Sequence, residues 1–356
     1  MSAKKAFHKG RGTADNPPNR FESLVYQPDP ELDDQEGTSL PTTRLFRDPS
    51  RTILAYNKSP DVGFTVSLNP YRGCEHGCVY CYARPTHEWL GFSAGLDFET
   101  RILAKADAPR LLDKALSSPT WQPRVIALSG VTDPYQPVER KLQLTRRCLA
   151  VLAAWRNPVA IVTKNALVTR DCDLLAELAQ VNAAAVFISI TTLNAQLARV
   201  MEPRASAPIR RLAAISSLAQ AGIPVGVMVA PIIPGLTDHE MPAILSAAAQ
   251  VGARFAGHTI VRLPYGVGDL FTQWLEDHYP ERKNKVLNRI RAMRQRKLNE
   301  SRWHIRMRGE GVFAESIHAL FAAGCRQAGL SSSETKLSTA AFRHPVGDVQ
   351  LSLFAN

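Results

Sequence analysis

The sequence predicts an α/β fold in which a parallel sheet, open or barrel-like, is covered by helices. The 356 residues are 45% hydrophobic and 21% charged, the composition of a soluble globular protein with a sizeable core. From about residue 52, short apolar runs alternate with segments of helical periodicity. Near-continuous apolar runs are typical of strands that are buried on both faces. The runs lie at residues 65–68, 124–128, 159–162, 184–190, 224–229 and 259–263.

Helices are expected between these runs, at residues 138–155, 171–181, 209–221 and 239–251. After the third of them, Gly222-Ile223-Pro224 combines a helix stop with the start of a strand. Alternating strands and helices form βα units, which build parallel sheets. We therefore expect six βα units over residues 51–265.

The two ends of the chain differ from this region. Residues 1–50 contain Gly10-Arg11-Gly12, Asn16-Pro17-Pro18-Asn19 and an acidic stretch at 28–36, without a persistent hydrophobic period. This composition predicts a flexible N-terminal arm. Residues 266–330 are expected to form a basic helical extension, and residues 331–356 a tail rich in Ser and Thr.

Charge and cysteine content limit the function classes. The net charge of +11 and the pI near 9.5 favour an anionic partner, nucleic acid before membrane. Residues 1–5 lead into a polar stretch, and no apolar run is long enough to span a bilayer, so we expect a cytoplasmic protein with no membrane partner. Six cysteines are too few for a disulfide scaffold, and three within eight residues indicate metal binding or redox chemistry.

These three cysteines are Cys74, Cys78 and Cys81, in the loop that follows the first predicted strand. Thiolates at the spacing Cys-x3-Cys-x2-Cys can reach three corners of a cubane cluster from one loop, and Gly73 and Gly77 allow tight backbone paths. No fourth cysteine is nearby, which would leave one iron open to a substrate ligand. A structural zinc site that adds His76 or His87 to the three cysteines remains an alternative at this point.

The cysteine spacing, with the aromatic Tyr80 before the last cysteine, resembles the radical S-adenosylmethionine (SAM) signature. The resemblance implies a partial (β/α)6 TIM-like barrel with a [4Fe–4S] cluster and SAM at the carboxyl ends of its strands. It implies one-electron cleavage of SAM to methionine and a 5′-deoxyadenosyl radical, with a reductase or flavodoxin-type protein as electron donor.

The polar residues at the predicted strand ends are similar to those of the spore photoproduct lyase-like branch, over roughly residues 55–265. The similarity implies that Tyr80 lies at the cofactor and that Ser129 and Asp133 face the methionine end of SAM. It also implies that Lys164 and Arg204 pair with the SAM carboxylate, and that Ser189 or Thr191 meets the ribose. The alternative for each is a local hydrogen bond or a surface salt bridge.

One departure from that branch concerns the substrate. Photoproduct lyases carry a hydrogen-donating cysteine just after strand two, where this chain has Ser129-Gly130-Val131-Thr132. The remaining cysteines, Cys148, Cys172 and Cys325, lie in helical patterns that are typical of core positions. The resemblance therefore implies SAM chemistry but does not carry over the splitting of thymine dimers.

A basic segment at residues 281–309 holds eleven Lys and Arg residues against two Glu residues. Apolar residues recur in it at near-helical spacing, so one face can pack while the rest stays basic. Such a segment can neutralise several phosphates, and an aromatic side chain in it can stack on a base. The candidate nucleic-acid contacts are Arg289, Arg294, Arg296, Lys297 and Trp303. The alternative is a solvated helix face.

The sequence as a whole predicts a radical SAM enzyme that acts on nucleic acid, DNA before RNA, in repair or replication. The alternatives are a radical enzyme that modifies RNA, a protein or a small molecule, and a non-catalytic, cluster-bearing DNA-binding factor. Retention of a reducible cluster without SAM turnover would favour the last of these. The particular substrate, the fate of SAM and the oligomeric state are not encoded in these patterns.

The tail offers a partner motif, because Gln350, Leu351, Ser352, Leu353 and Phe354 resemble the peptide by which bacterial polymerases and repair proteins dock on the sliding clamp. The apolar members suit pockets and Gln350 can set the register. The alternative is a terminal strand that packs on the domain. Removal of residues 350–356 should abolish clamp binding in a pull-down while SAM cleavage persists. Equal binding by the truncated chain would contradict the motif.

Overall fold

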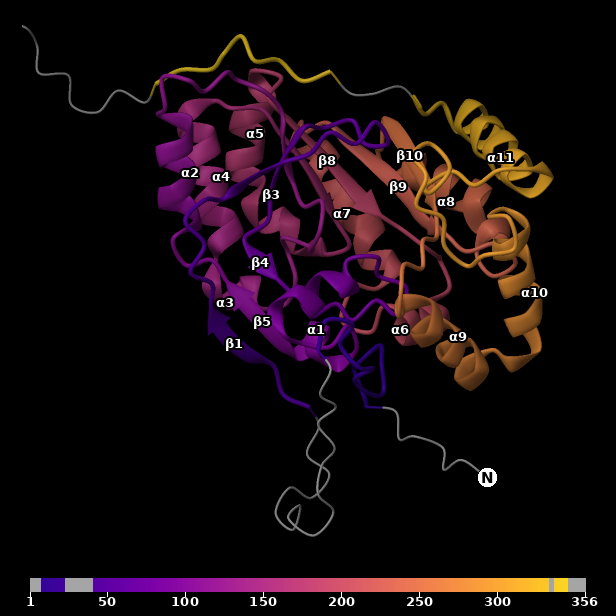
Figure 1. The fold of residues 1–356 in the computed structure, drawn as a ribbon. Helices are drawn as coiled ribbons and strands as arrows, with labels where there is room; N and C mark the ends of the chain where they lie inside the picture. Colours follow the sequence, from indigo (N-terminus) through magenta and orange to yellow (C-terminus); the bar gives the residue numbers. More distant parts are fainter. Residues whose placement is uncertain (1–7, 23–40, 333–335, 345–356) are drawn as a thin grey trace, which may run out of the picture.

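The computed structural model describes residues 8–22, 41–332 and 336–344, and a curved parallel sheet is its central feature (Figure 1). The strands follow the spatial order β10-β9-β8-β7-β6-β3-β2. All neighbours from β10 to β3 are parallel, and β2 pairs antiparallel with β3. The bounds are β2 Leu54–Tyr56, β3 Val66–Leu68, β6 Ile126–Leu128, β7 Val159–Thr163, β8 Ala184–Ser189, β9 Val225–Ile232 and β10 Phe255–Ile260. The predicted six-unit partial barrel is confirmed.

Helices connect the strands and cover the outer face of the sheet (Figure 1). Helix α4 packs against α2 and α5, and α8 packs against α7. The bounds are α2 Ala108–Leu116, α3 Glu139–Leu142, α4 Leu144–Trp155, η2 Ala166–Asp171, α5 Cys172–Gln180, α6 Ala195–Met201, α7 Pro208–Gln220, η3 Asp238–Glu240 and α8 Met241–Gln250. The helix expected over 138–155 is interrupted at Gln143, whose φ is +51°. Glu139 causes the break, because its carboxylate accepts hydrogen bonds from the N–H groups of Thr145 and Arg146 and so caps α4.

The last strand lies earlier than the sequence predicts. The apolar run at 259–263 suggests a strand there, whereas β10 is Phe255–Ile260 and residues 261–263 continue beyond it as buried coil. Gly257 and His258 interrupt the apolar pattern within β10 and account for the error. A Cβ on Gly226 of β9 would lie 2.0 Å from the Phe255 ring, and one on Gly257 would lie 2.6 Å from the Met228 sulfur. A strand that uses glycine to admit a neighbouring side chain does not present an apolar run.

The N-terminal region is more structured than the sequence predicts. Residues 41–50 include β1 Arg44–Arg47, which joins β4 Tyr71–Arg72 and β5 Arg101–Ala104 in a second sheet of order β1-β5-β4. Arg11 and Thr13 are buried, and the Arg11 guanidinium donates to the carbonyls of Glu99 and Pro41. The prediction of a flexible arm over residues 1–50 is therefore wrong for 8–22 and 41–50. Polar residues that form buried hydrogen bonds leave no hydrophobic period to detect.

The C-terminal extension comprises α9 Val267–His278, α10 Pro280–Ala292 and α11 Val312–Ala328. Val286, Leu287 and Ile290 form the buried face of α10, in an apolar cluster that also contains Trp274 and Tyr80. The extension therefore packs onto the cysteine loop. None of the helices in the described residues has the length and apolar character that crossing a membrane requires. The partner motif at 350–354 lies outside the described residues.

A histidine pair joins α11 to the sheet. His258 on β10 lies 2.8 Å from His318 on α11 (Nε2 to Nδ1), and its ring centroid is 4.0 Å from that of Phe321. His318 also contacts the Arg308 carbonyl oxygen. Burial, together with the charges of His318 and Arg308, lowers the pKa of His258 to about 4. The folded state thus keeps this ring neutral.

The buried pair should make folding sensitive to acid. An unfolded histidine titrates near pH 6.5, so between pH 6.5 and 4 the unfolded chain takes up a proton that folded His258 excludes. The contribution is fully present above pH 6.5 and is lost as the pH falls, at a cost of about 1–3 kcal/mol. In urea unfolding of metal-free protein at pH 7 and pH 4.5, His258→Phe should lose less stability on acidification than the wild type. An equal loss in both proteins would contradict this.

Candidate active site

The cysteine loop begins directly after β3 and β4, at the carboxyl edge of the sheet. Cys74 and Cys78 are buried, Cys81 is half-buried, and all three are free thiols. The Cys74 N–H donates to the Phe98 carbonyl oxygen at 2.9 Å, and the Val79 N–H donates to that of Met201 at 3.1 Å. These bonds fasten both halves of the loop to neighbouring helices.

A buried ion pair holds the backbone of the cysteine loop. Arg84 contacts Glu99 at 2.6 Å, and the Arg84 guanidinium also donates to the carbonyls of Gly77 and Cys78. The N-terminal segment completes this support, because the Gly12 N–H donates to Glu99 at 2.9 Å. A Cβ on Gly12 would lie 1.7 Å from the Gly77 carbonyl oxygen, so a larger residue cannot make this approach.

The three thiols lie close enough to influence one another. Burial raises the pKa of Cys74, and the charges of Asp133, Cys78 and Cys81 raise it further. Burial also raises the pKa values of Cys78 and Cys81. Three adjacent thiols in a dry environment fit the thiolate ligands of an iron–sulfur cluster, whose corners need sulfur atoms that are spread apart.

Both histidines of the zinc alternative have contacts with other residues. Within the described ranges, no group of three or more His, Cys, Asp or Glu side chains is placed to hold a single metal ion. His76 is engaged by Asp133 at 3.3 Å and Asn165 at 3.1 Å. His87 lies 2.9 Å from the Arg101 carbonyl oxygen, and burial lowers its pKa to about 4.

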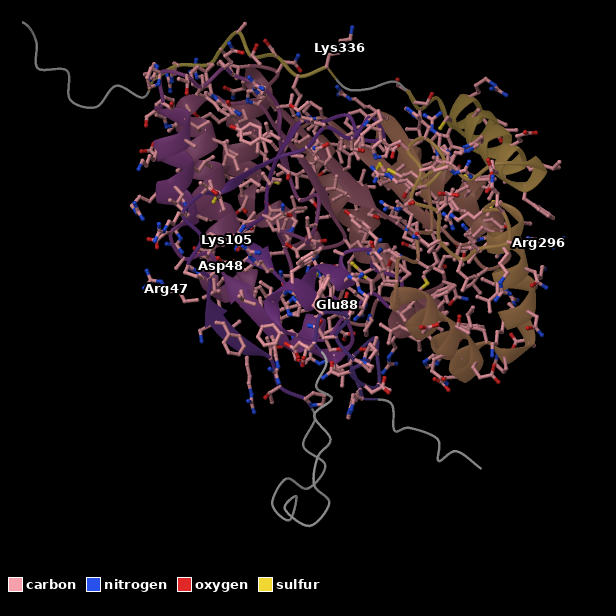
Figure 2. The ribbon with its side chains drawn as sticks, in the orientation of Figure 1. Arg47, Asp48, Glu88, Lys105, Arg296 and Lys336 are labelled. Atoms are coloured by element: carbon pink, nitrogen blue, oxygen red, sulfur yellow. The ribbon has the colours of Figure 1, made fainter. Side chains whose placement is uncertain are left out.

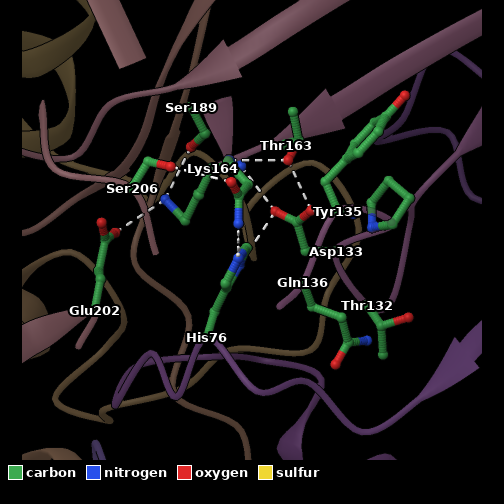
Figure 3. Close-up of polar contacts among 12 residues, drawn as sticks. His76, Thr132, Asp133, Tyr135, Gln136, Thr163, Lys164, Ser189, Glu202 and Ser206 are labelled. Carbon is green, nitrogen blue, oxygen red and sulfur yellow. Dashed lines mark hydrogen bonds and ion pairs between the residues drawn. The ribbon is translucent and has the colours of Figure 1, made fainter. Parts of the chain in front are cut away.

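Next to the loop, Lys164 is the centre of a polar cage (Figure 3). Its ammonium lies 2.9 Å from Ser189 Oγ, 3.0 Å from Thr191 Oγ1 and 2.9 Å from the Ala230 carbonyl oxygen. It also contacts the Glu202 carboxylate at 3.0 Å. Burial, followed by the charge of Arg211, lowers the pKa of Lys164 to about 7.

Glu202 binds the other members of the cage. Its carboxylate accepts hydrogen bonds from Tyr80 and from Thr191, and it pairs with the buried guanidinium of Arg211. Tyr80 is the aromatic residue of the cysteine loop, and its ring centroid lies 5.6 Å from the Lys164 ammonium. The structure thus brings Tyr80, Lys164, Ser189 and Thr191 together.

Asp133 lies beside this cage and is held by four neighbours. It accepts hydrogen bonds from Thr163 Oγ1 and from the Lys164 N–H, both at 2.7 Å, and from the Tyr135 N–H at 2.8 Å, and its other contact is His76 (Figure 3). Burial alone would raise the pKa of Asp133, but His76 and the backbone and hydroxyl donors lower it. Both oxygens are therefore engaged in positioning the loops after β6 and β7.

Ser129 and Arg204 do not join the cage. Arg204 pairs with Glu75 at 3.0 Å and donates to Thr43 at 3.2 Å. Ser129, at the end of β6, has a φ of +145°, and its side chain lies 3.5 Å from the Thr132 carbonyl oxygen. Both side chains therefore make the local hydrogen bonds or salt bridges that were named as the alternative to contacts with SAM.

The sequence analysis assigned no role to Glu202 or Arg211. It also did not predict that His76 contacts Asp133 and Asn165. Glu202 directly precedes the Pro203-Arg204 pair, and its position after the fourth strand was the available signal. Arg211 lies within an otherwise ordinary helical pattern, so only the fold identifies it. His76 lies inside the cysteine motif, but its ring contacts Asp133 and Asn165.

The predicted nucleic-acid residues have different environments. Arg294 is fully buried, and its guanidinium donates to the backbone carbonyls of Val261, Leu298 and Arg306. Its prediction as a nucleic-acid contact is therefore wrong, because the helical end turns this residue inward. Arg289 is paired with Asp238 at 3.0 Å. Arg296 is exposed near α10 (Figure 2), Lys297 is also exposed and Trp303 is 56% exposed.

Known proteins resemble this chain in sequence and in fold. The sequence model of the Radical SAM superfamily matches residues 68–248. An uncharacterized protein of Mycobacterium tuberculosis is 38% identical over 234 residues, which cover 64% of this chain and 68% of the relative. An uncharacterized protein of Methanocaldococcus jannaschii is 28% identical over 223 residues, or 62% of this chain and 79% of that one.

Among solved structures, a spore photoproduct lyase point mutant has a TM-score of 0.58 and 15% identity, covering 83% of this chain and 82% of the other. A spore photoproduct lyase variant with bound AdoMet and dinucleoside spore photoproduct has a TM-score of 0.57 and 16% identity, with the same coverage. At this identity the likeness concerns the fold.

The cage should be essential for stability, because Glu202 is the only carboxylate that contacts both Lys164 and Arg211 among the described ion pairs. Glu202→Gln leaves the buried Arg211 guanidinium without its counter-charge, which costs about 3–5 kcal/mol. Thermal unfolding of metal-free protein should show a clearly lower Tm than wild type. Glu177→Gln, an exposed change on α5, is the matched control and should leave the Tm unchanged. A Glu202→Gln protein as stable as the control would refute the argument.

Proposed function

Because the chain belongs to the radical SAM superfamily, we propose that it cleaves SAM reductively at a [4Fe–4S] cluster held by Cys74, Cys78 and Cys81, and that it acts on nucleic acid. The family implies both the cluster and SAM. The observation that carries the assignment to these residues is their position: three free, mutually adjacent thiols on one loop at the carboxyl edge of the sheet, within the matched range.

When bound, the cluster supplies the electron that cleaves SAM into methionine and a 5′-deoxyadenosyl radical. The protein's part is to hold SAM and to exclude water. Lys164 offers a buried cation for the SAM carboxylate, and to meet it Lys164 exchanges one of its present contacts for the ligand. Glu202 keeps Arg211, Tyr80 and Thr191 during this exchange, so the cage stays balanced.

Ser189 and Thr191 are proposed to meet the ribose, since their hydroxyls already lie at the Lys164 ammonium. Asp133 and Arg204 are proposed to act indirectly. Asp133 orients the Lys164 backbone and His76, and Arg204 holds Glu75 within the cysteine loop. Ser129, at the end of β6, remains a proposed neighbour of the methionine end.

Nucleic acid as the substrate is supported by two observations. The net charge of +11 favours a polyanionic partner. The lyase with the same fold has been solved with a dinucleoside spore photoproduct. We propose DNA before RNA on the latter ground.

The chemistry is tested on anaerobically purified full-length protein. Iron and sulfide are quantified, dithionite and SAM are added, and 5′-deoxyadenosine is followed by chromatography. Wild type should contain iron and sulfide and form the product, whereas Cys78→Ala should lose most iron and all product. Cys148→Ala removes a buried thiol from the core of α4 and should retain both. Zinc in place of iron, or product formation that Cys78→Ala does not reduce, would refute the proposal.

A further inference from the structure

A row of exposed aromatic side chains and arginines lies at the carboxyl edge of the sheet, and we call it the rim row. Its outer part consists of Arg20, Phe21, Trp89 and Tyr265, which come from the N-terminal segment, η1 Arg84–Leu90 and the coil after β10. Trp89 is 74% exposed, Tyr265 66% and Phe21 51%. Large exposed rings that gather on one surface indicate a binding site, whereas single exposed rings are common.

The outer members contact one another in sequence. The Phe21 and Trp89 rings lie 4.2 Å apart between centroids. The Arg20 guanidinium lies 5.0 Å from the Phe21 ring and 3.7 Å from the Tyr265 ring, so it connects the two aromatic groups. Glu88, which is buried, holds Arg20 in this position at 2.7 Å. The row is therefore a pre-organised surface.

The inner part of the rim row is formed by Tyr82 and Arg262, and it leads to the cysteine loop. Tyr82 directly follows Cys81, is 46% exposed and donates a hydrogen bond to the Gly130 carbonyl oxygen at 2.6 Å. The Arg262 guanidinium lies 5.5 Å from the Tyr82 ring. Arg262 Nε is buried without a hydrogen-bond partner, which is costly for a guanidinium unless a ligand supplies an acceptor.

Trp303 extends the same side of the molecule. Its neighbour His304 donates its N–H to Asp61 at 2.5 Å, and Arg306 pairs with the same carboxylate. The charge of Arg306 acts on Arg262, which places the two guanidinium groups near each other. Positive charge thus gathers beside Tyr82, at Arg262 and Arg306.

From these contacts we infer that the rim row binds single-stranded nucleic acid, with unpaired bases stacked on Trp89, Phe21 and Tyr265 and a phosphate at Arg262. This inference rests on the proposed nucleic-acid substrate and adds the mode of recognition. Aromatic platforms accept any base, since every base has a π-face, and arginines between them neutralise the backbone. A duplex buries its base faces, so only an unpaired or extruded nucleotide can use the row and reach Tyr82.

The charge pattern favours this occupant over a protein surface. Among the described residues, no carboxylate lies at hydrogen-bond distance from Arg262, and the chain as a whole is strongly basic. The basic helix α10 is a weaker candidate, because Arg294 beyond its end is buried and Arg289 is already paired with Asp238. Phe313 at the start of α11 is another exposed ring with an arginine over it, but that arginine, Arg289, already has Asp238 as its partner.

The test measures fluorescence anisotropy of a labelled 15-nucleotide single strand, as DNA and as RNA, with full-length protein at moderate salt. Trp89→Ala and Tyr265→Ala should each weaken binding about five- to tenfold, in line with the loss of one stacked base. Trp89→Phe keeps a ring and should restore most of the affinity, which separates stacking from misfolding. Arg262→Gln should weaken binding and reduce its salt dependence.

Phe313→Ala is the matched control, since Phe313 is also exposed and also lies beneath an arginine, Arg289. The affinity of this variant for the single strand should be within about twofold of wild type. An abasic strand of equal length should bind wild type weakly, and Trp89→Ala should not change that affinity. If the rim variants keep their affinity and Arg296→Gln loses it, the nucleic-acid surface lies near α10. That result would overturn the inference that the rim row binds nucleic acid. Absence of binding by wild type that still forms 5′-deoxyadenosine would overturn the nucleic-acid substrate while leaving the SAM chemistry in place.

Discussion

The carboxylate of Glu202 is the constraint on which the arrangement of the site depends. Its Oε1 atom is contacted by Tyr80, Thr191 and Lys164, and its Oε2 atom pairs with Arg211. The donors come from the cysteine loop, the ends of β7 and β8, and α7. One buried anion thus sets the spacing of four segments, and the low dielectric around it makes each contact strong and each loss costly.

The same cage explains how the Lys164 ammonium can be in position for a carboxylate ligand before that ligand binds. Lys164 is held by acceptors on three sides, so its position does not depend on a bound carboxylate. On the other side of Cys78, the Arg84–Glu99 pair and the N-terminal segment hold the backbone of the loop. Pre-organisation of both the cation and the thiols lowers the ordering cost of binding two groups in one site.

The sequence predicts most of the sheet because its strands are buried on both faces and read as apolar runs. It also predicts the cysteine loop, since the spacing of the thiols has a direct chemical meaning. The parts that it does not predict share a physical cause. Residues 11–13 order through buried hydrogen bonds, and Arg294 is buried by bonds to backbone carbonyls, so polarity gives the wrong expectation for both. Gly257, which lies against Met228, interrupts the apolar pattern of the last strand.

The rim row and the cysteine loop meet at two consecutive residues. Cys81 packs against the apolar clusters around Cys74 and Cys78, whereas Tyr82 is half exposed beside Arg262. Radical chemistry needs a dry environment, because water competes for reactive intermediates, but recognition of a polymer needs an accessible surface. Because solvent exposure increases between Cys81 and Tyr82, a substrate bound on the exposed surface can present one group to the buried site. In the proposed binding mode, a nucleotide stacks on the aromatic residues at that boundary while the rest of its strand stays in solvent.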